Sequence, residues 1–283
     1  MPVIKCASRS LDLSTTQVMG ILNVTPDSFS DGGSLYEKQQ LSLDALLYKA
    51  TAMVEQGATI VDVGGESTRP NAQPVSEQQE MDRVLPAVEL LAKNLDVVIS
   101  IDTSNAALMT ESAKLGAGML NDVRALEREG ALVAAAATGL PVCLMHMQGT
   151  PQTMQQAPAY QSVTAEVMRY LSCRAQLCEQ AGMMAGQIIL DPGFGFGKTL
   201  EQNLQLLQHT SAFVATGYPL MIGTSRKSMF GQLLAREVAD RLAGSLATGA
   251  YAGMQGAAIV RVHDVKETVD VVKVIEAVKG QGE

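Results

Sequence analysis

Eight short apolar runs recur along the chain, and nearly all of them end on a polar residue suited to binding or chemistry. Segments with helical spacing of apolar residues lie between the runs. Apolar runs without strict alternation are typical of parallel strands buried on both faces. The pattern therefore predicts an α/β protein with the (β/α)8 fold, the TIM barrel. The eight runs span residues 18–22, 59–63, 97–101, 117–120, 142–145, 188–190, 220–222 and 257–260.

The segments between the runs support one domain over residues 1–283, with the barrel proper at about 15–280. Ser76, followed three residues later by Gln79, has the spacing of a capping box at a helix start. Three loops, at residues 23–36, 64–75 and 145–159, are rich in turn-forming and polar residues, and we expect them to act as mobile lids. Helices are expected over residues 41–56, 76–91, 105–115, 160–181, 200–209, 237–255 and 266–279.

Composition narrows the class of protein. The 283 residues carry a net charge of −8, which argues against a nucleic-acid surface or a polybasic membrane patch. The N-terminus lacks the apolar stretch of a secretory signal, and no run approaches the roughly 18 residues of a membrane span. The cysteines have no CxxC or disulfide-framework spacing, so we expect buried thiols and a cytoplasmic protein. These cysteines are Cys6, Cys143, Cys173 and Cys178.

The glycine-rich segment DPGFGFGKT at residues 191–199 is not a phosphate loop. The Walker pattern needs a glycine where Pro192 stands, and the third glycine of the dinucleotide fingerprint would fall on Lys198. What remains is a strand that ends on a carboxylate, a proline turn and an aromatic wall at Phe194 or Phe196. Those parts suit a flat heterocyclic ligand.

Short motifs follow the apolar runs in a fixed order. Together they closely resemble bacterial dihydropteroate synthases of the pterin-binding family, over about the whole chain. Members of that family condense 6-hydroxymethyl-7,8-dihydropterin diphosphate with 4-aminobenzoate, release diphosphate and form 7,8-dihydropteroate for folate synthesis. The motifs are NVTPDSF at 23–29 with DGG at 31–33, GGESTRP at 64–70, SIDT at 100–103, ND at 121–122, MHM at 145–147, DPGFGFG at 191–197, SRKS at 225–228 and RVH at 261–263.

The resemblance implies a pterin site made by Asp102, Asn121, Asp191 and Lys227. An ionised carboxylate such as Asp191 can accept two hydrogen bonds from the amidine-like edge of the pterin. Loss of diphosphate develops positive charge on the pterin methylene, so we expect an SN1-like path in which a buried carboxylate stabilises the cation. Asp191, Lys227, Asp102 and Arg69 are the expected catalytic residues.

An acidic chain must meet a diphosphate with local cations. By resemblance, the diphosphate is bound by Thr68, Arg69, Arg261, Val262 and His263. Mg²⁺ is the implied cofactor, with Asn23 as its protein ligand and with phosphate oxygens and waters completing the octahedron.

The 4-aminobenzoate pocket is implied at Phe29, Pro70, Phe196, Lys227 and Ser228. Ser228, at an expected helix start, can offer a hydroxyl and a backbone N–H to the carboxylate. Phe29 and Pro70 match sulfonamide-sensitive members of the family, so we expect sulfonamides to inhibit. The family also implies a homodimer.

Other readings remain open at this point. A related pterin-binding barrel transfers a methyl group between a folate and a corrinoid protein, and a noncatalytic paralogue would bind pterin without turnover. Arg69, Arg261 and Ser228 speak against the methyltransferase. Lys227 could form a Schiff base in an aldolase-type barrel, which nothing else supports. The task of His146, at the end of the fifth run, cannot be assigned.

Overall fold

The computed structural model describes residues 3–25, 35–37, 40–67, 75–150, 153–154 and 158–280. Eight strands form one parallel sheet in the order β10-β9-β8-β7-β6-β3-β12-β11. A bridge between Leu190 and Leu220 joins the two end strands and closes the barrel, as the sequence predicts. The barrel strands are β3 (Gln17–Asn23), β6 (Ile60–Gly64), β7 (Val98–Asp102), β8 (Met119–Asp122), β9 (Val142–Met145), β10 (Ile188–Asp191), β11 (Met221–Ile222) and β12 (Ile259–Val262).

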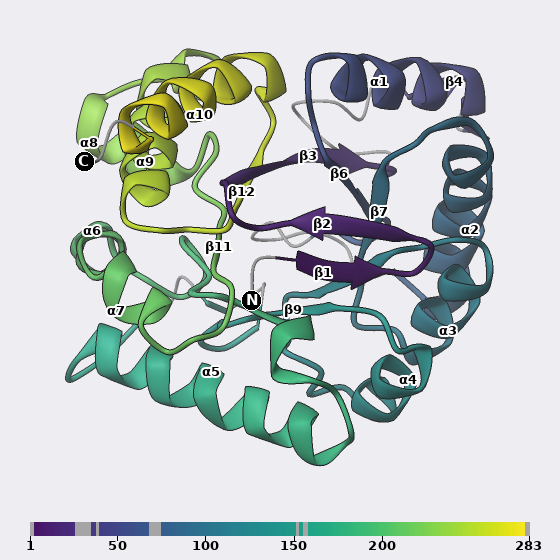
Figure 1. The fold of residues 1–283 in the computed structure, drawn as a ribbon, viewed down its shortest axis with the longest axis horizontal. Helices are drawn as coiled ribbons and strands as arrows, with labels where there is room; N and C mark the ends of the chain where they lie inside the picture. Colours follow the sequence, from purple (N-terminus) through teal and green to yellow (C-terminus); the bar gives the residue numbers. More distant parts are fainter. Residues whose placement is uncertain are drawn as a thin grey trace.

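Helices surround the barrel (Figure 1). The expected capping box is present, because Ser76 Oγ accepts from Gln79 N while the Gln79 side chain accepts from Ser76 N. The helices are α1 (Leu43–Glu55), α2 (Glu77–Asn94), α3 (Ala106–Lys114), α4 (Ala131–Thr138), α5 (Val163–Gln180), α6 (Leu200–Gln208), α7 (Thr210–Val214), α8 (Ser228–Leu234), α9 (Leu242–Met254) and α10 (Val265–Lys279), with 3-10 turns η1 (Ala185–Gln187) and η2 (Val238–Asp240).

Two small antiparallel ladders lie outside the barrel. β1 (Val3–Cys6) pairs with β2 (Arg9–Asp12), and β4 (Tyr36–Glu37) pairs with β5 (Gln40–Leu41). The β1–β2 hairpin crosses the barrel in the view of Figure 1, and its Ile4, Cys6 and Leu11 join the apolar cluster inside the barrel. The hairpin therefore closes one end of the barrel, and the sequence had not predicted it.

The barrel interior is layered, because successive side chains of a strand point to opposite faces of the sheet. Each barrel strand contributes one apolar residue to the inner cluster: Met19, Ile60, Val98, Met119, Cys143, Ile189, Met221 and Ile259. Two positions further along the same strands, the inward residues include Asp62, Ser100, Asn121, Asp191 and Arg261. The interior thus changes from apolar to polar toward the carboxyl ends of the strands, where barrels carry their active sites.

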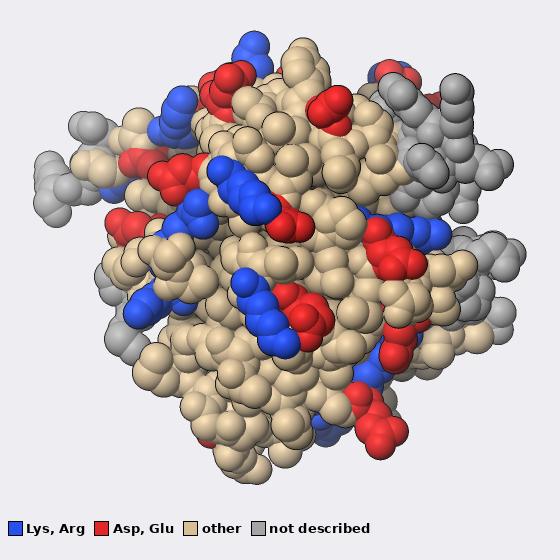
Figure 2. All heavy atoms as spheres, turned by 90° about the vertical axis from the view of Figure 1, so that its right-hand side faces the viewer, with Lys and Arg blue, Asp and Glu red and all other residues tan. Residues whose placement is uncertain are grey.

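Charges of both signs are interspersed on the face seen in Figure 2, without a broad field of one sign. Some surface charges pair within a helix, as Lys93 does with Glu89 and Lys114 with Glu111. Cys173 is exposed, which corrects the expectation that all four cysteines are buried. Among the helices of the described ranges, none combines the length and apolar character needed to cross a membrane.

Candidate active site

A charged cluster lies at the carboxyl ends of the barrel strands. Arg261, on β12, binds two carboxylates: its Nε lies 2.6 Å from Asp62 Oδ2 on β6, and its terminal nitrogen lies 3.0 Å from Asp102 Oδ2 on β7. Asp62 is fully buried, and its Oδ2 also accepts from Asn121 Nδ2 at 3.0 Å. The barrel therefore brings together Asp102, Asn121 and Arg261 from three predicted binding positions.

Asp62 was not among the predicted residues, because it lies within an apolar run rather than at its end. In the described part of the chain, Asp62 Oδ1 and Ser100 Oγ are the two buried side-chain atoms without a hydrogen-bond partner. A buried acceptor without a partner is costly, so a ligand N–H or a water is its natural partner. The sequence feature that could have pointed to Asp62 is a charged residue inside an otherwise apolar run.

Asp191 ends β10 and is buried, with 5% of its surface exposed. Its Oδ1 accepts from Gly193 N at 2.7 Å. Burial raises the pKa of this carboxyl, while the Gly193 N–H, Lys227 and Arg261 oppose the rise. Burial likewise raises the pKa of Asp102, against the effect of Arg261. Two predicted pterin carboxyls thus lie in a poorly hydrated site beside cations.

Lys227 approaches this site from the loop before α8. Its Nζ donates to the carbonyl oxygen of Phe194 and lies 4.3 Å from the centre of the Phe196 ring. Burial lowers the pKa of Lys227 to about 8, although Asp191 raises it. Ser228 begins α8 and is exposed, as expected for a residue at a helix start. Phe196, Lys227 and Ser228 therefore lie close together in the chain's fold.

The loops after β11 and β12 are fastened to each other. Ser225 Oγ lies 3.0 Å from His263 Nδ1 and accepts from His263 N at 3.1 Å. Arg226 forms a bidentate ion pair with Asp264, with its Nε 2.9 Å from one carboxylate oxygen. The Val262 side chain packs in the core between barrel and helices, so only its backbone is available for the predicted contact with diphosphate.

Several predicted site residues lie outside the described ranges: Phe29, Thr68, Arg69 and Pro70. Asn23 lies within the described ranges, at the end of β3. Its Oδ1 is near Gly64: a Cβ added to Gly64 would lie 3.5 Å from this oxygen. Within the described residues, no group of three or more His, Cys, Asp or Glu side chains is placed to hold a metal ion. A single amide oxygen fits a cation whose other ligands are phosphate and water, and does not form a protein-only cage.

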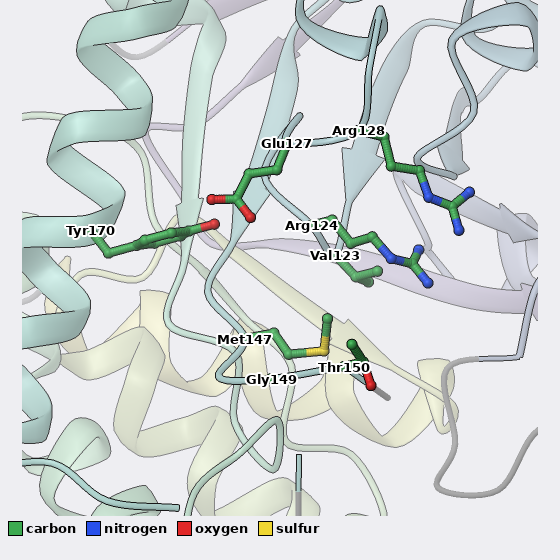
Figure 3. A pocket seen from close by; sticks show the side chains of 8 residues that line it. All are labelled: Val123, Arg124, Glu127, Arg128, Met147, Gly149, Thr150 and Tyr170. Carbon is green, nitrogen blue, oxygen red and sulfur yellow. The ribbon is translucent and has the colours of Figure 1, made fainter. Parts of the chain in front are cut away.

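A cavity of about 230 Å³ opens between the loops after β8 and β9 and Tyr170 of α5 (Figure 3). Val123 and Met147 contribute apolar surface. Arg124 and Arg128 both pair with Glu66, so their charges are largely committed within the protein. The cavity is lined by Val123, Arg124, Glu127, Arg128, Met147, Gly149, Thr150 and Tyr170.

His146, whose task the sequence left open, does not lie free in the site. It is buried, its Nδ1 lies 3.0 Å from Lys198 Nζ, and its ring packs edge-on against Tyr170 at 5.0 Å. Burial lowers its pKa to about 3, with Lys198 adding to the effect. The ring of His146 is therefore held in place by Lys198 and Tyr170.

These features define a (β/α)8 enzyme whose strand ends hold buried carboxylates and cations around a site for a polar heterocycle and an anion. A family model described as "Pterin binding enzyme" matches residues 19–263. The dihydropteroate synthase of Escherichia coli (strain K12) is 56% identical over 268 residues, which cover 95% of this chain and 93% of that protein.

Solved structures agree with this match. A Yersinia pestis dihydropteroate synthase in complex with a sulfonamide drug superposes with a TM-score of 0.94 at 52% identity, over 98% of this chain and 99% of that one. A Xanthomonas albilineans dihydropteroate synthase with 4-aminobenzoic acid gives a TM-score of 0.91 at 43% identity, over 99% of each chain. The chain belongs to the pterin-binding enzyme family, among its dihydropteroate synthases.

Proposed function

We propose that this chain condenses 6-hydroxymethyl-7,8-dihydropterin diphosphate with 4-aminobenzoate to give 7,8-dihydropteroate and diphosphate. The observation that carries the proposal is the buried Asp191 carboxylate at the end of β10, beside Lys227 and Arg261. Such a carboxylate can accept hydrogen bonds from the donors of a pterin edge. In a site shielded from water, it can also stabilise the cation that the reaction forms.

For the pterin, Asp191 accepts the paired donors of the amidine-like edge, while Asn121 and Asp102 meet other polar atoms. Lys227 donates to the ring carbonyl and nitrogen. Asp62 positions Arg261 and Asn121, because its Oδ2 accepts a hydrogen bond from each of them. Its Oδ1 can then accept from a ligand or a water. The polar layer of the barrel is thereby complementary to one flat, hydrogen-bonding ring.

Breaking the bond between the pterin methylene and the diphosphate oxygen leaves positive charge on the methylene and the ring. The Asp191 carboxylate stabilises this cation more than the neutral ground state, which is how binding becomes catalysis. The amine nitrogen of 4-aminobenzoate then forms the new bond to the methylene and loses a proton. The departing electron pair stays with the diphosphate.

The anion site is formed by Arg261 and His263 with Thr68, Arg69 and the backbone at Val262. Arg261 uses Nε and one terminal nitrogen for Asp62 and Asp102, and a guanidinium has five N–H donors, so donors are left for phosphate. Mg²⁺, bound by Asn23, would neutralise charge on the diphosphate oxygens. The remaining positive charge around the diphosphate comes from the side chains of this site.

The second substrate is placed over Lys227, between Phe196 and the start of α8. Ser228 binds its carboxylate, and Phe29 and Pro70 complete the apolar wall. Because sulfonamides have the shape of 4-aminobenzoate, we expect them to compete with it here. The complex of the Yersinia pestis relative with a sulfonamide drug supports this expectation. An inhibition constant far above the KM for 4-aminobenzoate would contradict it.

The test of the reaction is diphosphate release in a coupled assay that depends on both substrates. We expect the Asp191→Asn variant to fold and to lose about 100-fold in kcat, because the neutral amide no longer stabilises the cation. Near-normal kcat in the folded variant would remove Asp191 from the mechanism. Turnover that required a corrinoid protein instead would favour the methyl-transfer alternative.

The enzyme is further proposed to act in the cytoplasm and as a homodimer. Support for the dimer comes from exposed apolar side chains on three neighbouring helices. These helices are neighbours because α9 packs against α10, and Gly244 of α9 lies against Phe230 of α8. Large exposed apolar residues on contiguous elements are typical of protein interfaces. They are Leu233, Leu234, Tyr251, Met254, Val274 and Val278.

A further inference from the structure

Lys198 is a buried lysine whose hydrogen bonds go to neutral acceptors; burial lowers the pKa of its ammonium, and the Asp191 carboxylate opposes that shift. Only 3% of the residue is exposed. Its Nζ lies 2.8 Å from Gly193 O, 2.9 Å from Phe196 O and 3.3 Å from His146 O, in addition to 3.0 Å from His146 Nδ1. Four acceptors for three N–H groups explain how an ammonium is kept in this place, because burying a charge without such partners is prohibitively costly.

The four acceptors come from two loops that meet backbone to backbone. Gly193 has a φ of +70°, and a Cβ there would lie 1.9 Å from His146 O. Gly197 has a φ of +67°, and a Cβ there would lie 2.6 Å from Gln148 O. Only glycine allows these approaches. The segment 192–197 is therefore pressed against the start of the loop after β9, with the Lys198 ammonium at their junction.

The opposite side of segment 192–197 holds Lys227. The carbonyl oxygen of Phe194 accepts from Lys227 Nζ, and the Phe196 ring lies under the same ammonium. Gly195 lies against the Lys227 stem, since a Cβ on it would be 3.2 Å from Lys227 Cδ. Any shift of this segment would displace Lys227 and Phe196 together.

We propose that Lys198 is a positioning residue for the 4-aminobenzoate pocket: its ammonium gathers the carbonyls of His146, Gly193 and Phe196, and so fixes the segment that holds Lys227 and Phe196. This inference rests on the proposed function. His146, which directly follows β9, then anchors that ammonium. Because an ammonium can only donate, His146 Nδ1 accepts the hydrogen bond from Lys198 Nζ, which assigns the ring proton of neutral His146 to Nε2.

The central test is the Lys198→Met variant, which keeps the length and apolar stem of the side chain and removes the ammonium. Misplacement by about 1 Å can cost roughly 100-fold in rate, so we expect a loss of that order in kcat/KM for 4-aminobenzoate. Melting temperature and circular dichroism are measured on the same samples. The matched control is Lys93→Met, which removes an exposed lysine on α2 and should leave both kinetic constants unchanged.

Lys198→Gln provides a second variant, because its amide oxygen would face carbonyl oxygens and should also impair the pocket. Wild-type kcat and KM in the folded fraction of either variant, even with a lowered melting temperature, would make Lys198 a stabilising residue only and would overturn the proposal. If the wild-type enzyme itself releases no diphosphate from the two substrates, the proposed function fails instead. The two failures are therefore distinct.

Discussion

At the scale of single residues, the site works by placing ionisable groups where water is scarce. Lys227 shows this best, since burial lowers its pKa to about 8, while Asp191 and Asp102 raise it and Arg261 lowers it. In the proposed mechanism, the charged form of Lys227 donates to the pterin ring. We therefore expect loss of the Lys227 proton to lower activity on the alkaline side.

We expect kcat/KM for the pterin diphosphate to fall above about pH 8, with the slope of a single proton. The sign follows from the pKa: a lysine loses its positive charge as the pH rises through that value. The Lys227→Arg variant, although less active, should lack this fall because a guanidinium stays charged. A flat wild-type profile between about pH 7 and pH 10 would contradict the assignment.

Polar residues at strand ends are easier to single out from the sequence than residues inside strands or loops. Asp191 and Arg261 stand out because each follows an apolar run. Asp62 lies inside such a run, and its inward direction depends on strand register, which the run alone does not give. Lys198 acts through a contact between residues 52 apart in the chain, and local patterns carry no sign of such a contact.

At the scale of elements, the apolar runs predict all eight barrel strands with ends within about two residues, because a strand buried on both faces leaves a continuous apolar signal. Helix α4 was not predicted. Its sequence, ALVAAAAT, is apolar throughout and has no polar face to reveal a helical period. The β1–β2 hairpin was also missed, because each strand is only four residues long.

That hairpin makes a stability prediction possible. Ile4 is 3% exposed and packs inside the barrel, whereas its neighbour Val3 is 56% exposed on the same strand. We expect Ile4→Ala to lower the free energy of unfolding by about 2–4 kcal/mol, because it opens a cavity in the core. Urea unfolding followed by circular dichroism measures the change.

The matched control is Val3→Ala, which should change the free energy of unfolding by less than about 0.5 kcal/mol. Since the hairpin closes the end of the barrel opposite the polar layer, kcat of folded Ile4→Ala should equal that of the wild type. Equal destabilisation by the two substitutions would mean that the hairpin does not close the barrel through Ile4. A fall in kcat of fully folded Ile4→Ala would mean that the hairpin is not independent of the active site.

At the scale of the whole molecule, the polar cluster and the proposed dimer surface lie on different parts of the fold. The polar cluster lies at the strand ends inside the barrel, while the exposed apolar side chains of α8, α9 and α10 lie on the outer layer of helices (Figure 1). The described residues Asp102, Asn121, Asp191, Lys227 and Arg261 all come from a single chain. A dimer through the outer helices would therefore leave that cluster in place.

The Val274→Asp variant tests this arrangement. Val274 is 64% exposed on α10, and a carboxylate there would be buried without a partner in an interface that covers the helix. We expect a dimer for the wild type and a monomer for the variant in analytical ultracentrifugation. Val133→Asp is the control, since Val133 is 73% exposed on α4, far from α10 in the view of Figure 1. A monomeric wild type would mean that there is no such interface, and equal dissociation by both substitutions would mean that the interface lies elsewhere. The kcat of the Val274→Asp monomer should remain close to that of the wild type, because one chain provides the whole cluster.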